Sequence, residues 1–185
     1  MKILHISDLH FGPPYLPRVG QAMIELAPKL NPDAIVVSGD LTQRAKREQF
    51  VAAREFLDQL PKCPMLVIPG NHDVPLYRVK ERLTDPLGLY REIITDDLAP
   101  VLTMDEAIIV GLDSTSPRRA ISNGRIVPSQ LEHSGRVFGA ASPELCKILV
   151  AHHHFAPAPD NLRDNAMPKA KRAINQFVDQ GVELI

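Results

Sequence analysis

Short, continuous apolar segments recur along this chain, and they constrain its fold more than any other feature of the sequence. They lie at residues 3–6, 34–37, 65–68, 107–112, 147–151 and 182–185. Continuous apolar runs of this length are typical of strands covered on both faces, as in layered α/β proteins. The chain of 185 residues is 44% hydrophobic, which is enough for a core and excludes a disordered protein. The sequence therefore predicts an α/β fold.

Helical patterns separate several of these segments. The first pattern, which we expect to face the core, is the stripe Val19, Met23, Leu26 and Leu30. Pro28 should kink that helix or end it early. The second stripe is Phe50, Ala53, Leu57 and Leu60. A third helix is predicted to start near Pro168 and to stop near Gly181, with one side formed by Ala170, Ile174, Phe177 and Val178. Residues 74–106 indicate a helical excursion followed by a hairpin.

Polar residues follow directly after five of the apolar segments. The residues that follow these segments are "SDLH", "SGD", "PGNHD", "DSTS" and "HHHF". Ligands bind at the carboxyl ends of strands in open α/β sheets, so we expect these ends to meet at one edge. The side chains gathered there would be Asp8, His10, Asp40, Asn71, His72, Asp73, His152, His153 and His154. Carboxylate, amide and imidazole groups without a thiolate favour Mn, Fe or Zn.

The number of these ligands indicates two metal ions rather than one. Two carboxylates and several imidazoles exceed the needs of a single ion, and two ions about 3.5–4 Å apart can share a carboxylate. Each motif alone has a plainer explanation, because a lone Asp or His after a strand is commonly a loop cap, and Gly and Asn are ordinary turn residues. The prediction rests on the conjunction of several such strand ends in the right order.

Charge and cysteine content exclude several other classes of protein. The formal net charge is −1, and the charges are mixed along the chain, which argues against a dedicated nucleic-acid binder. Cys63 and Cys146 lie far apart and outside any CxxC pair, as expected for reduced thiols of a cytoplasmic protein. No signal-peptide pattern and no apolar stretch of about 20 residues is present, so we expect no membrane span.

Some remaining polar residues carry weaker predictions. We expect His5 to be a satisfied histidine of the core and His133 to lie on a helix surface. Asp113 and Ser114 follow a strand, where a turn cap is the first interpretation and support of the metal ligands is the second. Three arginines offer contacts to a substrate phosphate as the second interpretation, and a solvated loop is the first: Arg118, Arg119 and Arg125.

The motifs "DLH", "GD", "GNHD" and "HH", in this order and over residues 1–155, resemble those of the calcineurin-like metallophosphoesterases. The resemblance implies a four-layer αββα sandwich with a two-metal site at its edge, formed here by a single domain over residues 1–185. It implies that Asp8 and His10 bind the first metal ion, that Asp40 bridges both ions, and that Asn71 and His152 bind the second.

The resemblance also implies catalytic and substrate-binding roles. His72 would act as general acid or charge stabiliser beside the substrate phosphate, oriented by Asp73. Asn71 and His72 would contact the substrate, and His153 would point toward it. His154 stands where the family commonly has proline, and we expect it to be a solvated loop residue.

One family motif has no counterpart in this sequence. The last motif of the family, Gly-His-x-His, follows a strand, and the segment "GVELI" resembles that strand but ends the sequence at Ile185. The expected metal ligands are therefore reduced to five. On this ground we expect a shortened chain that lacks the end of its domain and binds metal weakly.

The function implied by the resemblance is metal-dependent hydrolysis of a phosphoester by a metal-bridging hydroxide. The opening "ILHISDLHFG" and "GNHD" resemble the bacterial phosphodiesterase branch, which includes class III cyclic nucleotide phosphodiesterases, so we expect a small phosphodiester or a monoester as substrate. One alternative is a nuclease of the same superfamily. Another is a non-catalytic scaffold on this fold, although such scaffolds tend to lose the histidine that corresponds to His72. The sequence predicts no oligomeric state.

Overall fold

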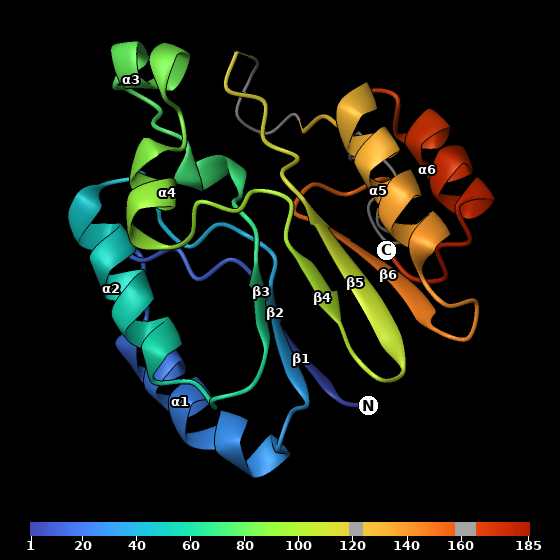
Figure 1. The fold of residues 1–185 in the computed structure, drawn as a ribbon. Helices are drawn as coiled ribbons and strands as arrows, with labels where there is room; N and C mark the ends of the chain where they lie inside the picture. The colour runs from blue at the N-terminus through green and yellow to red at the C-terminus, as the bar shows by residue number, and fades with distance from the viewer. Residues whose placement is uncertain (119–123, 158–165) are drawn as a thin grey trace.

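A computed structural model describes residues 1–118, 124–157 and 166–185. Six strands, six α-helices and one short 3-10 helix occur in these ranges (Figure 1). In chain order they are β1 (Ile3–Ile6), α1 (Pro17–Leu30), β2 (Ala34–Val37), α2 (Arg47–Asp58), β3 (Met65–Val67), η1 (Asn71–Asp73), α3 (Val79–Thr84), α4 (Gly88–Ile93), β4 (Val101–Thr103), β5 (Ala107–Leu112), α5 (Pro128–Ala140), β6 (Cys146–Ala151) and α6 (Ala170–Asp179).

The first sheet is formed by β1, β2 and β3, which are parallel and lie in this order. The helices α1 and α2 connect these strands and cover one face of the sheet (Figure 1). Because side chains alternate across a strand, Ile35 and Val37 of β2 pack toward the helices, against residues such as Phe50 and Leu57 of α2. The parallel arrangement brings the carboxyl ends of all three strands to the same edge.

The second sheet is formed by β4, β5 and β6. The hairpin β4–β5 is antiparallel, and it lies later than predicted, because only β4 falls within residues 74–106. β5 pairs in parallel with β6 after the crossover through α5. The helices α5 and α6 cover the outer face, where Phe138 and Phe177 are fully buried against Val110 and Leu149. Burial of two whole aromatic side chains makes a large contribution to the free energy that holds these helices on the sheet.

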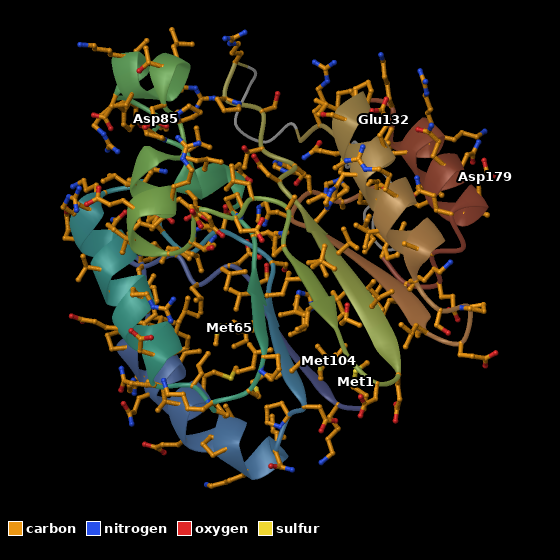
Figure 2. The ribbon with its side chains drawn as sticks, viewed as in Figure 1. Met1, Met65, Asp85, Met104, Glu132 and Asp179 are labelled. Carbon is orange, nitrogen blue, oxygen red and sulfur yellow. The ribbon has the colours of Figure 1, made fainter. Side chains whose placement is uncertain are left out.

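The two sheets pack face to face and complete a four-layer α/β/β/α arrangement, as predicted (Figure 1). Val36 and Leu66 of the first sheet meet Ile109 and Val150 of the second in one buried cluster. The sheets approach closely at Gly111, where an added Cβ would lie 2.7 Å from Cγ2 of Ile68. In Figure 2, Met1 and Met104 mark the end of the sheets where β1 begins, opposite the edge that carries the polar strand ends.

The predicted stripe of α2 is confirmed, but the predicted stripe of α1 is wrong. Val19, Leu26 and Leu30 are more than half exposed, and the residues of α1 that are buried are Gly20 and Ala27. Small residues on the inner side let the helix lie close to its neighbours. Met23 of the predicted stripe is half-buried against the core, and its other three residues are exposed. Pro28 does not end the helix early, because it lies in the last turn and Asn31 caps the helix in a left-handed conformation.

The structure also tests the predictions made for two histidines and for the last helix. His5 is exposed and hydrogen-bonded to Oγ of Ser38, so its assignment to the core is wrong. His133 lies on α5, where its side chain is half-buried. The helix predicted near Pro168 begins at Ala170, and the chain turns with a positive φ at Gly181. Among the described residues, no helix has both the length and the apolar character needed to cross a bilayer.

Candidate metal centre

Three of the predicted metal ligands have a left-handed backbone. The φ angles are 58° at Asp8, 51° at His10 and 54° at Asp40. Residues other than glycine adopt this region rarely, at a cost of order 1–3 kcal/mol each. Hydrogen bonds from Asp8 N to the Gly39 carbonyl (3.1 Å) and from His10 N to the Asp40 carbonyl (2.9 Å) hold the two strand ends together. The left-handed backbone therefore directs the side chains of Asp8, His10 and Asp40 toward the same point.

Two glycines let the loops after β2 and β3 touch. Gly39 has φ 98°, and an added Cβ there would lie 2.7 Å from the Gly70 nitrogen and 2.9 Å from Nδ1 of His152. An added Cβ at Gly70 would collide with the carboxylate and the backbone nitrogen of Asp40. Both positions therefore require glycine, because any side chain would separate the strand ends that carry the polar residues.

The carboxylate of Asp40 lies at the centre of the site and is almost fully buried. Its Oδ2 is 3.5 Å from Nε2 of His10, and its Oδ1 is 3.4 Å from Nε2 of His152. Oδ1 also accepts a hydrogen bond of 2.8 Å from the backbone nitrogen of His72. Burial alone would raise the pKa of Asp40, but His152 and the His72 amide lower it below its ordinary value. Asp40 is therefore held as an anion with one oxygen facing each histidine.

His152 comes from the second sheet and is fixed by a backbone contact. Its Nδ1 donates to the carbonyl of Ser38 at 2.8 Å, which leaves Nε2 facing Asp40 and, at 3.0 Å, Oδ1 of Asn71. A carbonyl partner on the far nitrogen is the usual way to orient a metal-binding imidazole. Burial lowers the pKa of His152, but the bond and charge of Asp40 and the Ser38 carbonyl together raise it to about 9.

His72 stands on the other side of the site, within the 3-10 helix η1. Its Nδ1 lies 3.0 Å from the carbonyl of Gln43, and its ring meets the ring of His10 edge-to-face, with 4.7 Å between centroids. The contact to Gln43 favours the tautomer with the proton on Nδ1, so Nε2 is available toward the site. Sequence reasoning missed Gln43, because a backbone carbonyl gives no signal in the side-chain pattern.

The orientation of His72 by Asp73 is not seen in this structure. The fully buried carboxylate of Asp73 accepts hydrogen bonds from the backbone nitrogens of Gly70 (2.9 Å), Leu41 (3.2 Å) and Thr42 (2.9 Å), and from the Thr42 hydroxyl (3.1 Å). Burial raises the pKa of Asp73 to about 6 despite these donors. Asp73 therefore ties the loop after β2 to the loop after β3 and acts on the backbone rather than on the imidazole.

The next histidine of "HHHF" lies against His152, with 5.0 Å between the ring centroids and an edge-to-face arrangement. His153 is buried, with its Nδ1 2.8 Å from Oγ of Ser114, so Ser114 contacts a histidine that was predicted to face the substrate and not one of the predicted metal ligands. His154 is exposed, as expected. Asp113 caps its own turn by accepting a hydrogen bond from the nitrogen of Thr115. Arg118 and Arg125 are exposed, and Arg119 lies outside the described residues.

The donor set fits two metal ions that share a ligand. Within the described residues, two groups of donor atoms each fall within 4.8 Å of one another: Asp8, Asp40 and His152 form one, and His10, Asp40 and His72 form the other. Asp40 belongs to both groups. Nδ1 of His10 is buried and has no hydrogen-bond partner among the described residues. The expected pairing of Asp8 with His10 remains geometrically available, because their side chains lie 3.4 Å apart.

An α/β/β/α sandwich with a shared carboxylate between imidazoles at its edge defines a class of two-metal hydrolytic proteins. The family model of the calcineurin-like phosphoesterases matches residues 1–179. The chain belongs to this family.

Individual relatives agree with this assignment. A probable cyclic nucleotide phosphodiesterase from Synechococcus sp. is 31% identical over 163 residues, which cover 83% of this chain and 58% of the relative. The glycerophosphodiester phosphodiesterase GpdQ of Enterobacter lignolyticus is 37% identical over 83 residues, or 40% of this chain and 30% of that protein. The chain thus spans less than two thirds of either relative. The purple acid phosphatase PPD1 from yellow lupin has the same fold, with a TM-score of 0.67 at 12% identity, over 98% of this chain and 36% of that one.

Proposed function

We propose that this protein hydrolyses a small phosphodiester or phosphomonoester with the help of two metal ions. The observation that carries the proposal is the position of Asp40, whose two carboxylate oxygens each face the imidazole of a different histidine. A shared carboxylate of this kind is the central ligand of two-metal sites. The two relatives are named for cyclic nucleotides and for glycerophosphodiesters, which supports a small phosphodiester as the substrate.

The proposed ligands follow from the contacts around Asp40. Asp8 and His10, whose side chains lie 3.4 Å apart, would hold one ion, and Asn71 and His152, which lie 3.0 Å apart, would hold the other, with Asp40 shared between them. Oxygen and imidazole donors without a thiolate favour Mn, Fe or Zn. When bound, such ions supply Lewis-acid activation of water and neutralise charge on a phosphoryl group. The strained backbone at Asp8, His10 and Asp40 is consistent with side chains that are positioned before any ion arrives.

His72 is the proposed catalytic residue of the chain itself. The contact between its Nδ1 and the Gln43 carbonyl orients the ring so that Nε2 faces the site. From there Nε2 would stabilise charge on the phosphoryl oxygens or give a proton to the leaving oxygen. Asp73 would serve by position, because its carboxylate holds the backbone that carries His72 and Asp40. Asn71, His72 and His153 are the proposed contacts to substrate, with His153 held by Ser114.

Cleavage of bis(4-nitrophenyl) phosphate and of 4-nitrophenyl phosphate, each with and without added Mn²⁺, tests the proposal. We expect Mn²⁺-dependent release of 4-nitrophenol from at least one of the two. Asp40→Asn should lower the rate by about 10²-fold or more, because both ions lose a ligand. The matched control is Asp58→Asn, whose carboxylate pairs with Arg54 on the surface of α2. Cleavage of neither compound, with Mn²⁺ bound to the protein, would favour the scaffold alternative. Equal rates for both variants would exclude this site.

A further inference from the structure

A cavity of about 590 Å³ adjoins the candidate metal centre. Its walls come from the end of β1, the segment between β1 and α1, and the first turns of α1. One side of the cavity is formed by Asp8, His10 and His72, which also belong to the metal centre. A volume of this size is typical of small-molecule sites. The cavity therefore opens directly onto the point where we place the phosphate.

Apart from Ser7, Gln43 and Tyr15, the rest of the lining is apolar. It includes Leu9, Leu16, Val19, Met23 and Phe56. Leu16 and Val19, at the start of α1, are 64% and 62% exposed, which is unusual for large apolar side chains. The stripe that the sequence predicted for the core thus contributes its first half to the wall of this cavity. An apolar wall beside charged ligands is a common design of sites that bind an ester with a charged and an apolar part.

The shape of the cavity depends on Tyr15. Its ring stacks on Phe11, with 4.2 Å between centroids and 25° between the planes. Its hydroxyl reaches α1 at Gly20, where an added Cβ would collide with it. Phe11 is buried and packs in turn against Phe56, with 5.7 Å between centroids. The aromatic stack fixes one wall between the metal ligands and the helix.

Resting on the proposed function, we propose that this cavity binds the organic group of the substrate and that this group is an apolar aryl or alkyl group. A phosphate held beside Asp8, His10 and His72 would place a group attached to phosphorus against the apolar wall. A polar group such as glycerol would lose water there without finding matching partners along Val19 and Met23. Val19 and Met23 are then specificity residues, which contact the organic group and not the reacting atoms.

Binding of simple phosphonates isolates this site from the chemistry, because the carbon–phosphorus bond is not hydrolysed and each molecule carries one organic group. The dissociation constants of phenylphosphonate, methylphosphonate and 2-hydroxyethylphosphonate would be measured by calorimetry on the Mn²⁺-loaded protein. We expect phenylphosphonate to bind about tenfold or more tightly than either of the others. On the protein loaded with diamagnetic Zn²⁺, a ¹³C-methyl spectrum of the methionines should show a shift at Met23 with phenylphosphonate only.

Substitutions on α1 locate the effect. Met23→Gln and Val19→Asn should each remove most of the preference for phenylphosphonate and leave the affinity for methylphosphonate unchanged. Met23→Leu should keep the preference. The control Leu26→Gln adds the same amide to the same helix at a position that is half exposed and outside the cavity. Because Val19 is on the surface, the Val19 variant remains informative if a Met23 variant fails to fold.

The outcomes separate this inference from the proposed function. Tighter binding of phenylphosphonate that is lost in Val19→Asn and retained in Leu26→Gln supports the inference. Equal binding of the three phosphonates, or a preference that survives both Val19→Asn and Met23→Gln, overturns it while the phosphate site stands. Failure of every phosphonate to bind overturns the phosphate site, and the inference with it.

Discussion

Asp40 and His152 meet across the two sheets of the sandwich, with Nε2 of the histidine 3.4 Å from Oδ1 of the carboxylate. Asp40 follows β2 in the first sheet, and His152 follows β6 in the second. Their contact links the two sheets at the edge that carries the polar residues, and it brings together one candidate metal ligand from each sheet. The candidate centre therefore depends on the packing of the sheets, in addition to the local loops that present each side chain.

The pairing of these two residues should make the stability of the metal-free protein depend on pH. The folded-state pKa of His152 is raised from 6.5 to about 9, so its contribution is complete below pH 6.5 and is lost as the pH rises to about 9. The pKa of Asp40 is lowered, so its contribution is lost in acid, below the ordinary value of 3.8. Urea unfolding in EDTA should give a free energy of unfolding lower at pH 9 than at pH 6 by on the order of 1–3 kcal/mol.

Two histidine variants identify the source of that decline. His152→Asn should flatten the change between pH 6 and pH 9, whereas His154→Asn, which alters the exposed neighbour in the same run, should retain it. An undiminished decline in His152→Asn would assign the effect to another group.

Asp73→Asn should destabilise the fold, because the new amide NH₂ would face donors that the carboxylate now satisfies. A buried donor without a partner costs about 1–3 kcal/mol, so we expect a loss of at least about 2 kcal/mol in urea unfolding. Asp97→Asn is the matched control, since Asp97 caps an exposed turn through the nitrogen of Ala99. If Asp73→Asn kept full stability and Mn²⁺ binding and lost only turnover, a direct action of Asp73 on His72 would replace the positional role.

His72→Asn should lower turnover of bis(4-nitrophenyl) phosphate by roughly 10²–10³-fold and leave the metal content unchanged, because the ring serves charge stabilisation or proton transfer. Metal per chain would be measured by elemental analysis after dialysis. His133→Asn, on α5, is the control. Loss of one equivalent of metal would instead make His72 a ligand, in the group that it forms with His10 and Asp40.

Gly39→Ala should separate the two strand ends that form the site. The methyl group would lie 2.7 Å from the Gly70 nitrogen, at a residue with φ 98°, and we expect a destabilisation of about 2 kcal/mol or more together with weaker Mn²⁺ binding. Gly139→Ala places the same methyl group on α5 with no atom within 4 Å, and it should stabilise the protein by about 0.5–1 kcal/mol. Thermal unfolding of both variants checks the pair. A Gly39→Ala protein with unchanged melting temperature and metal affinity would contradict the close approach.

Part of this structure follows from local chemistry and was therefore predictable. Continuous apolar runs predicted β1, β2, β3, β5 and β6, whereas the run at 182–185 forms only an isolated bridge from Leu184 to Ile148. The polar residues directly after β1, β2 and β3 predicted the edge at which Asp8, Asp40 and Asn71 gather, because neighbouring parallel strands end on the same side. The stripe of α2 was predictable from its helical spacing, and Phe50 and Leu57 on that stripe are buried.

What the sequence by itself determined was which residue types stand at which strand ends, since that depends only on order and spacing along the chain. The tertiary structure alone decided the side that α1 buries, the carbonyl of Gln43 as the partner of His72, and the turn of Asp73 toward backbone amides. Each of these depends on close approach between segments far apart in sequence. Small residues such as Gly20, and backbone groups that every residue carries, make such contacts without leaving a pattern in the sequence.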